Sequence, residues 1–257
     1  MIFREAGEQG NPVVMLLHGG GLSDWSLRHV AEGLKTDYHV VTPILDGHGE
    51  AADTVFESIE AEAEKLLAYV DERFGGHVHA LCGLSIGAQI VVEMLTRRTD
   101  IAACAVVESA LLIPIPGAAM MTGPMLSLSY GLIKKRWFAR LQAKSLCIPE
   151  DLFETYFQES QRMSKQSLAN ITTSNSRYAL KRAVRETTAR VLILVGGKEL
   201  SVMKKSASLL HDAVRESELR VMPGKKHGET SLREPEAFVK SLKAFFASSA
   251  ENQKSVL

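Results

Sequence analysis

Short runs of apolar residues alternate along this chain with longer amphipathic segments, and this alternation constrains the fold more than any other feature. The candidate strands are residues 13–17, 39–42, 78–82, 103–107, 191–195 and 219–222. Segments with helical spacing of apolar residues cover 27–35, 57–74, 86–97 and 236–246. Strands that are apolar on both faces and are separated by helices form a largely parallel sheet between helical layers. The predicted fold class is α/β, with a mostly parallel central sheet flanked by helices.

About eighty residues without a convincing strand separate the candidate strand that ends near Glu108 from the one that begins at Val191. A single crossover helix needs far fewer residues, so this segment is interpreted as an inserted helical cap. We expect a core made of residues 1–110 and 190–247, with the cap at 111–189. The small polar residues of 248–257 predict a frayed or disordered C-terminal tail.

The first part of the predicted cap, residues 109–133, contains no charged residue and is long enough to cross a bilayer if it were helical. Three prolines and three glycines interrupt it, which argues against a spanning helix. We interpret it as an internal apolar lining in which Met120, Met121 and Met125 shape an adaptable substrate pocket. An equally supported alternative is that these residues only pack the cap onto the core.

Composition and charge exclude several classes of protein. The 257 residues include 30 Lys and Arg and 30 Asp and Glu, so the formal net charge is zero and nucleic-acid binding is not expected. The three cysteines fit neither a disulfide framework nor a zinc site, and no phosphate loop, dinucleotide motif or metal-spaced cluster occurs, so no cofactor or metal is expected. The first residues lack the apolar stretch of a signal peptide, which predicts a cytoplasmic protein.

Two glycine-containing motifs follow candidate strands. Gly83-Leu84-Ser85-Ile86-Gly87 lies between the strand at 78–82 and a helical segment, and in that context G-x-S-x-G places a serine on a tight turn. His18-Gly19-Gly20-Gly21 leaves the strand at 13–17, and the backbone N–H groups of such a loop can stabilise an oxyanion. Because both motifs follow parallel strands, we expect them at the end of the sheet where α/β proteins bind ligands.

With these motifs the chain resembles the α/β-hydrolase superfamily, and the resemblance covers most of its length. Further matching segments are Asp46-Gly47-His48-Gly49, Val195-Gly196-Gly197-Lys198-Glu199 and Pro223-Gly224-Lys225-Lys226-His227-Gly228. The resemblance implies a triad in the order Ser, acid, His. It implies Ser85 as nucleophile and His227 as general base.

The acid of this implied triad has two candidates. Glu199, in the loop after the strand at 191–195, matches the family position, although Asp is more frequent there. Glu108, at the end of the strand at 103–107, is the alternative, since some relatives place their carboxylate at that point. We favour Glu199. The resemblance also implies an oxyanion hole formed by the N–H groups of Gly20 and Ile86, with Gly21 and Leu84 among the substrate-binding residues.

The expected function is hydrolysis of an uncharged carboxylic ester or related acyl compound through an acyl-enzyme, with an apolar small molecule as substrate. The implied triad also resembles those of carbon–carbon bond hydrolases and thioesterases, so these activities stay open as alternatives. A ligand-binding regulator that retains the hydrolase scaffold with little turnover is a second class of function. The uncharged stretch and the basic residues 134–136 raise a third class of function, that of a peripheral membrane protein. Contact with a membrane is not expected.

Overall fold

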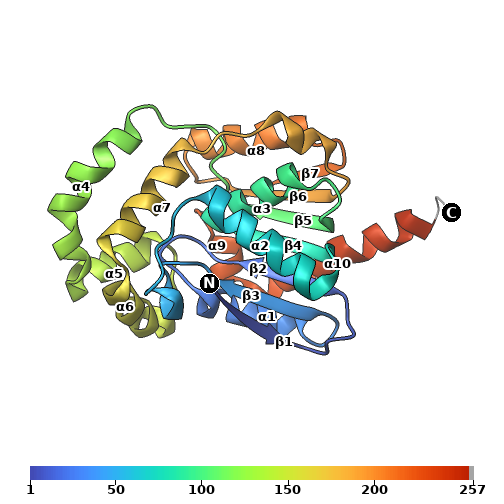
Figure 1. Cartoon of the computed structure of the whole chain (residues 1–257), viewed down its shortest axis with the longest axis horizontal. Helices are drawn as coiled ribbons and strands as arrows, with labels where there is room; N and C mark the ends of the chain where they lie inside the picture. The colour runs from blue at the N-terminus through green and yellow to red at the C-terminus, as the bar shows by residue number, and fades with distance from the viewer. Residues whose placement is uncertain (255–257) are drawn as a thin grey trace.

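The computed structural model describes residues 1–254. Within this range the chain forms one sheet of seven strands (Figure 1). Within this range, nothing is described of the side chains at 125, 127, 128 and 248–254. The strands are β1 (Ile2–Ala6), β2 (Val13–Leu17), β3 (His39–Ile44), β4 (Val78–Leu84), β5 (Ala102–Glu108), β6 (Arg190–Gly196) and β7 (Ser217–Met222). Their order is β1-β3-β2-β4-β5-β6-β7, and only β1 runs antiparallel to its neighbour. The predicted α/β class with a mostly parallel sheet is confirmed.

Each face of the sheet is covered by its own group of helices because successive side chains of a strand point to opposite faces. In β2, Met15 and Leu17 pack into the cluster that includes α2 (Ile59–Phe74), α3 (Ile86–Arg97) and α8 (Ser201–Ala213). The alternate residues Val14 and Leu16 pack against α1 (Arg28–Leu34) and α10 (Pro235–Lys254). A short helix, α9 (Glu229–Arg233), precedes α10.

Helix α2 shows how local sequence sets these elements. Ser58 caps its first turn, where the hydroxyl accepts a hydrogen bond from Ala61 N at 3.1 Å. The helix ends at Gly75, whose φ of 65° is a left-handed conformation that glycine adopts without strain. Between these ends the buried side chains recur at helical spacing, so one stripe of the helix packs on the sheet.

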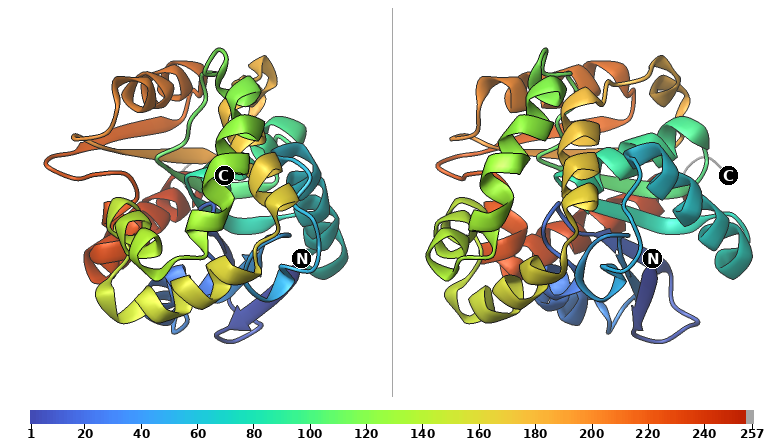
Figure 2. Two further views of the ribbon diagram at one scale, coloured as in Figure 1. Left: turned by 90° about the vertical axis from the view of Figure 1, so that its left-hand side faces the viewer. Right: turned by 60° about the vertical axis from the view of Figure 1, so that its left-hand side comes forward.

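Four α-helices lie between β5 and β6 in sequence and cover the C-terminal ends of the strands (Figures 1 and 2). They are α4 (Ala118–Ile133), α5 (Arg136–Ser145), α6 (Phe153–Arg162) and α7 (Lys165–Arg177). Helices α4 and α7 pack side by side (Figure 2). On α6, the carboxylate of Glu159 accepts hydrogen bonds from Trp25 Nε1 at 2.7 Å and Ser23 Oγ at 2.8 Å, which holds this helix against the core.

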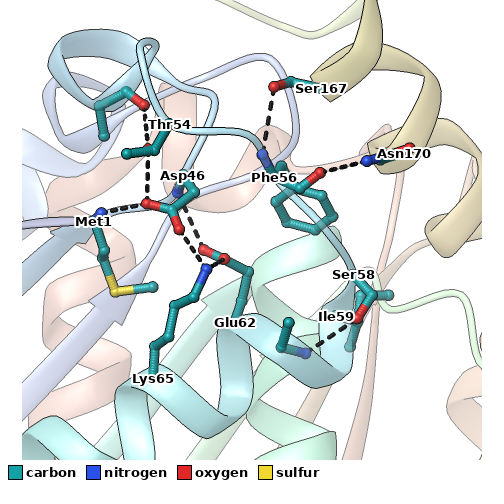
Figure 3. Close-up of polar contacts among 12 residues, drawn as sticks. Met1, Asp46, Thr54, Phe56, Ser58, Ile59, Glu62, Lys65, Ser167 and Asn170 are labelled. Atoms are coloured by element: carbon teal, nitrogen blue, oxygen red, sulfur yellow. Dashed lines mark hydrogen bonds and ion pairs between the residues drawn. The ribbon is translucent and has the colours of Figure 1, made fainter.

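Helix α7 has one face bound to the core segment that precedes α2 (Figure 3). Ser167 Oγ accepts from Phe56 N at 3.3 Å, and Asn170 Nδ2 donates to Phe56 O at 2.8 Å. One turn further on, Ser174 Oγ accepts from Ile59 N at 3.0 Å. Positions 167, 170 and 174 share a helix face by their 3- and 4-residue spacing. The other side of α7 is thereby held toward the ends of the strands.

The structure differs from the sequence predictions at both ends of the chain. Strand β1 was not predicted, and it pairs with β3 at the edge of the sheet. Helix α10 continues through Lys254, so the part of the predicted tail at 248–254 is helical, because nothing in its composition stops a helix that is already formed. The remaining tail positions, 255–257, lie outside the described residues. No helix in the described range is long and apolar enough to cross a membrane.

Candidate active site

Ser85 lies on a strained turn between β4 and α3. Its φ of 55° and ψ of −115° are unfavourable for a residue with a side chain. Two glycines make this turn possible. A Cβ on Gly83 would lie 2.4 Å from Gly87 O, and a Cβ on Gly87 would lie 2.5 Å from His18 O. The spacing of the motif is therefore required by backbone contacts with β2 and α3, and it leaves the serine hydroxyl at the end of the sheet.

The hydroxyl of Ser85 is the first member of a hydrogen-bonded chain of three side chains. Its Oγ lies 2.9 Å from Nε2 of His227, which precedes α9. The Nδ1 of the same ring lies 2.8 Å from Oε2 of Glu199, in the loop after β6. The three residues come from three different strand ends and are separated by up to 142 positions in sequence. The fold thus brings together the serine, histidine and glutamate that the sequence singled out.

Both oxygens of the Glu199 carboxylate form hydrogen bonds. Its Oε1 accepts from Gly196 N at 2.7 Å and from Ser109 Oγ at 2.8 Å. Burial by itself would raise the pKa of Glu199, but the hydrogen bonds from His227, Gly196 and Ser109 outweigh it and hold the pKa below its usual value. Glu199 is therefore an anion fixed in orientation, and Oε2 is directed at the imidazole.

Ser109 is a positioning residue that the sequence analysis did not identify. It follows β5 directly and has a φ of 58°, which a non-glycine residue rarely adopts. A serine after a strand is too common to stand out in a sequence. Its relation to Glu199, 90 positions away, is a property of the folded sheet, in which β5 and β6 are neighbours.

Glu108, the alternative acid, takes no part in the chain of hydrogen bonds to Ser85. Its Oε1 accepts from Ser231 N at 3.3 Å, and its Oε2 is buried without a hydrogen-bond partner among the described residues. Burial raises the pKa of Glu108 above its usual value, more than the bonds from Ser231 lower it. A buried carboxyl of this kind is favoured in its neutral form, and the geometry assigns the contact with His227 to Glu199.

The glycine loop after β2 is fixed by the buried ring of His18. Its Nδ1 lies 2.9 Å from Gly19 O, and its Nε2 accepts from Leu45 N at 3.1 Å. These partners define a neutral ring that carries its proton on Nδ1. Gly20 adjoins Ile86, since a Cβ on Gly20 would be in ordinary van der Waals contact with the Ile86 side chain at 3.6 Å. Ile86 is the first residue of α3, where a backbone N–H has no acceptor within the helix.

We expect the protein to lose stability in mild acid, because the buried rings of His18 and His48 have lowered pKa values. Burial lowers the pKa of His18 to about 4, while burial and the neighbouring His18 ring lower that of His48 to about 3. In the unfolded chain both titrate near 6.5. Between pH 6.5 and 4 the unfolded state therefore binds protons that the folded state does not, and the free energy of unfolding falls as pH falls. For His18 alone we expect a loss of about 3 kcal/mol by pH 4.

Urea unfolding at pH 7, 6, 5 and 4.5 measures this loss. The variant His48→Gln removes one of the two titrating rings and can retain a donor for Asp46 O, which His48 Nδ1 contacts at 2.9 Å. We expect a weaker dependence of stability on pH in this variant, whereas His29→Gln, at an exposed position, serves as the control. An unchanged dependence in His48→Gln would show that its ring is not held neutral.

A cavity of about 290 Å³ lies between the strand ends and the cap, and Ser85 is on its wall. The core contributes Gly20, Gly21, Ser85 and Ile86. The cap contributes Tyr130, Ile133, Gln142, Leu146, Tyr156, Ser160, Met163, Leu168, Ile171, Thr172 and Asn175. None of these residues carries a charge. In the described part of the chain no group of three or more His, Cys, Asp or Glu side chains is placed to hold a metal ion.

Among the other predicted substrate-binding residues whose side chains the structure describes, one lines this cavity. Gly21 does so, whereas Leu84 is buried beneath the cap with Leu22 and Trp25. The prediction for two cap methionines is wrong, since Met120 is 80% exposed, Met121 is 59% exposed and neither lines the cavity. Helix α4 is apolar on all sides, so its sequence does not show which side faces inward. The side chain of Met125 lies outside what the structure describes.

Comparison with known proteins places this geometry in a family. The sequence model of the alpha/beta hydrolase family matches residues 14–241, which include most of β2, all of β3 to β7, the elbow at Ser85 and the loops that carry Glu199 and His227. The chain belongs to the alpha/beta hydrolase family. The superfamily resemblance predicted from the motifs is thereby confirmed.

Individual relatives of this alpha/beta hydrolase are distant. An uncharacterized hydrolase of Saccharomyces cerevisiae is 29% identical over 105 residues, which is 38% of this chain and 36% of the yeast protein. The alignment therefore spans about a third of that relative. A thermophilic esterase from Thermogutta terrifontis superposes with a TM-score of 0.78 at 17% identity, covering 96% of this chain and 93% of the other. An esterase from Rhodococcus sp. ECU1013 gives 0.76 at 20% identity, covering 96% and 94%. At these identities the two structures show a shared fold.

Proposed function

We propose that this protein is a serine hydrolase that cleaves an uncharged carboxylic ester through an acyl-enzyme. The observation that carries the proposal is the hydrogen-bonded chain from Ser85 through His227 to Glu199 on the wall of a cavity. A serine activated by an imidazole whose other nitrogen meets a carboxylate is the arrangement that acyl transfer requires. The esterases with the same fold agree with this reaction.

Each of these groups has a defined role in the proposed reaction. Ser85 Oγ attacks the ester carbonyl and transfers its proton to His227 Nε2, while Glu199 stabilises the resulting imidazolium. The N–H groups of Gly20 and Ile86 bind the developing oxyanion, and the helix dipole of α3 adds to their field. The alcohol leaves with the proton from His227. A water molecule activated by the same imidazole then releases the acid from Ser85.

The composition of the cavity supports an uncharged, compact substrate. No charged side chain occurs among the described residues that line the cavity, so these residues offer no partner for a buried carboxylate or phosphate, and burying an unpaired charge is strongly unfavourable. Its volume of about 290 Å³ is at the lower end for small-molecule sites. We therefore expect short acyl or aromatic esters to be better substrates than long-chain lipids.

Two measurements test the proposal. A fluorophosphonate probe is expected to label Ser85 in the folded protein, as located by peptide mass spectrometry. In steady-state assays, p-nitrophenyl butyrate is expected to exceed its anionic analogue, the mono-p-nitrophenyl ester of succinic acid, by about 100-fold or more in kcat/KM, since the succinate carboxylate finds no partner. A protein that binds small esters without turnover and leaves Ser85 unlabelled would instead be a ligand-binding regulator.

A further inference from the structure

The hydrogen-bonding groups that line the cavity differ in whether they already have a partner. Tyr130 donates its hydroxyl to Met163 O at 2.9 Å, Ser160 donates to Phe157 O at 2.8 Å, and Thr172 donates to Leu168 O at 2.8 Å. All three acceptors are main-chain carbonyls of α6, of α7 or of the short segment between them. These three hydroxyls therefore donate their hydrogen bonds within the cap and not to a molecule in the cavity.

Gln142 differs from these three hydroxyl residues. Its Oε1 is buried and has no hydrogen-bond partner among the described residues, although Gln142 lines the cavity. A buried amide oxygen without a donor is costly, and nearly all such atoms in folded proteins are satisfied. A partner supplied by the substrate would satisfy this one, because the cavity that Gln142 lines is also lined by Ser85.

The position of Gln142 on α5 is set by the packing of that helix. Ala139 and Ala143 are the buried residues of α5, and their small side chains let the helix lie close to the core. Gln142 adjoins this buried stripe, so its side chain is at the boundary between packed core and cavity. The exposed face of the same helix carries Trp137 and Leu141, each 59% exposed. The helix therefore presents its amide, and not its large apolar side chains, to the cavity.

We infer that Gln142 determines substrate specificity by accepting a hydrogen bond from a hydroxyl or amide N–H on an uncharged ester substrate. This inference rests on the proposed function and adds to it the class of substrate: an ester with a neutral hydrogen-bond donor away from the bond that is cleaved. Tyr156, which is buried in the same wall, has a hydroxyl without a hydrogen bond to another described residue, so the donor can be a hydroxyl that also accepts from Tyr156.

Isosteric ester pairs test this inference. The first pair is 3-(hydroxymethyl)phenyl acetate and 3-ethylphenyl acetate, and the second is p-nitrophenyl 6-hydroxyhexanoate and p-nitrophenyl heptanoate. Within each pair a hydroxyl replaces a methyl group, on the alcohol side or on the acyl side. In at least one pair the wild-type protein is expected to favour the hydroxyl member in kcat/KM by about 10-fold, because the other member leaves Oε1 unpaired.

Variants of Gln142 assign this preference to the amide oxygen. Gln142→Leu, which fills a similar volume without an acceptor, is expected to abolish or invert the preference, largely through KM. Gln142→Asn keeps a neutral amide acceptor on a side chain shorter by one methylene and is expected to retain part of the preference. As a matched control, Met163→Leu changes the lining without changing its polarity and is expected to affect both members of a pair equally.

The outcomes separate this inference from the proposed function. Turnover of all four esters without a preference for either hydroxyl member, or a preference that survives in Gln142→Leu, would overturn the role of Gln142 and leave the hydrolase intact. No Ser85-dependent turnover of any ester would overturn the proposed function and this inference with it.

Discussion

Replacing Ser85 with alanine is expected to lower kcat on a short neutral ester by about 10⁶-fold, as loss of the nucleophile does in a serine protease. The substitution removes a single heavy atom, Oγ, which forms a hydrogen bond with His227 Nε2. The backbone strain at φ 55° is the same for serine and alanine, so the thermal midpoint should change little. Steady-state kinetics with p-nitrophenyl butyrate and fluorophosphonate labelling measure the effect.

A second serine in the same cavity provides the matched control for this variant. Ser160 lines the cavity, but its hydroxyl donates to Phe157 O within α6. Ser160→Ala is therefore expected to retain labelling and nearly all of its turnover. Comparable activity in Ser85→Ala and Ser160→Ala would mean that Ser85 is not the nucleophile.

The parts of the fold that could be predicted are those whose packing requires a recognisable sequence pattern. Strands β2 to β6 are buried on both faces in their central part, so their sequences are continuous apolar runs. The elbow was predictable for a stricter reason. Gly83 and Gly87 are required by carbonyl oxygens within 2.5 Å of where a Cβ would lie.

The parts that could not be predicted have no such pattern. Strand β1 contains Arg4 and Glu5, pairs on one side only and is partly exposed, so five residues show no apolar run. The cavity lining was missed because it includes polar residues of α7, such as Thr172 and Asn175, that a sequence does not distinguish from solvent-facing ones. Their side of α7 faces the cavity because Ser167, Asn170 and Ser174 bind the core, 111 to 115 positions away.

The chain of contacts around Glu199 could be anticipated only in outline. The resemblance to the α/β-hydrolase superfamily implied that Ser85, Glu199 and His227 meet. The choice between two glutamates at neighbouring strand ends depended on where each side chain finds donors. Glu199 has Gly196 N, Ser109 Oγ and His227 Nδ1, whereas Glu108 has Ser231 N at 3.3 Å. This difference leads to the second large prediction.

Glu199→Gln is expected to lower kcat by about 10⁴-fold with little change in the fold, as amide replacement of a triad acid does elsewhere. Gly196 N–H can only donate, so it holds the amide oxygen of the glutamine at the Oε1 position. The amide NH₂ then faces His227 Nδ1 and forces the ring to carry its proton on Nε2. In that tautomer Nε2 cannot accept the proton of Ser85.

The matched control is Glu108→Gln, because an amide has nearly the same shape as a carboxyl and burial raises the pKa of this carboxyl. Since burial favours the protonated form of Glu108, and since its carboxyl does not contact His227, this variant should keep kcat within about 10-fold of wild type. Urea unfolding of both variants checks that the fold is retained. A collapse of kcat in Glu108→Gln with near-normal turnover in Glu199→Gln would reverse the assignment. The proton balance at His227 would then be controlled from β5 through Ser231 and α9, and not through the contact that Glu199 makes from the loop after β6.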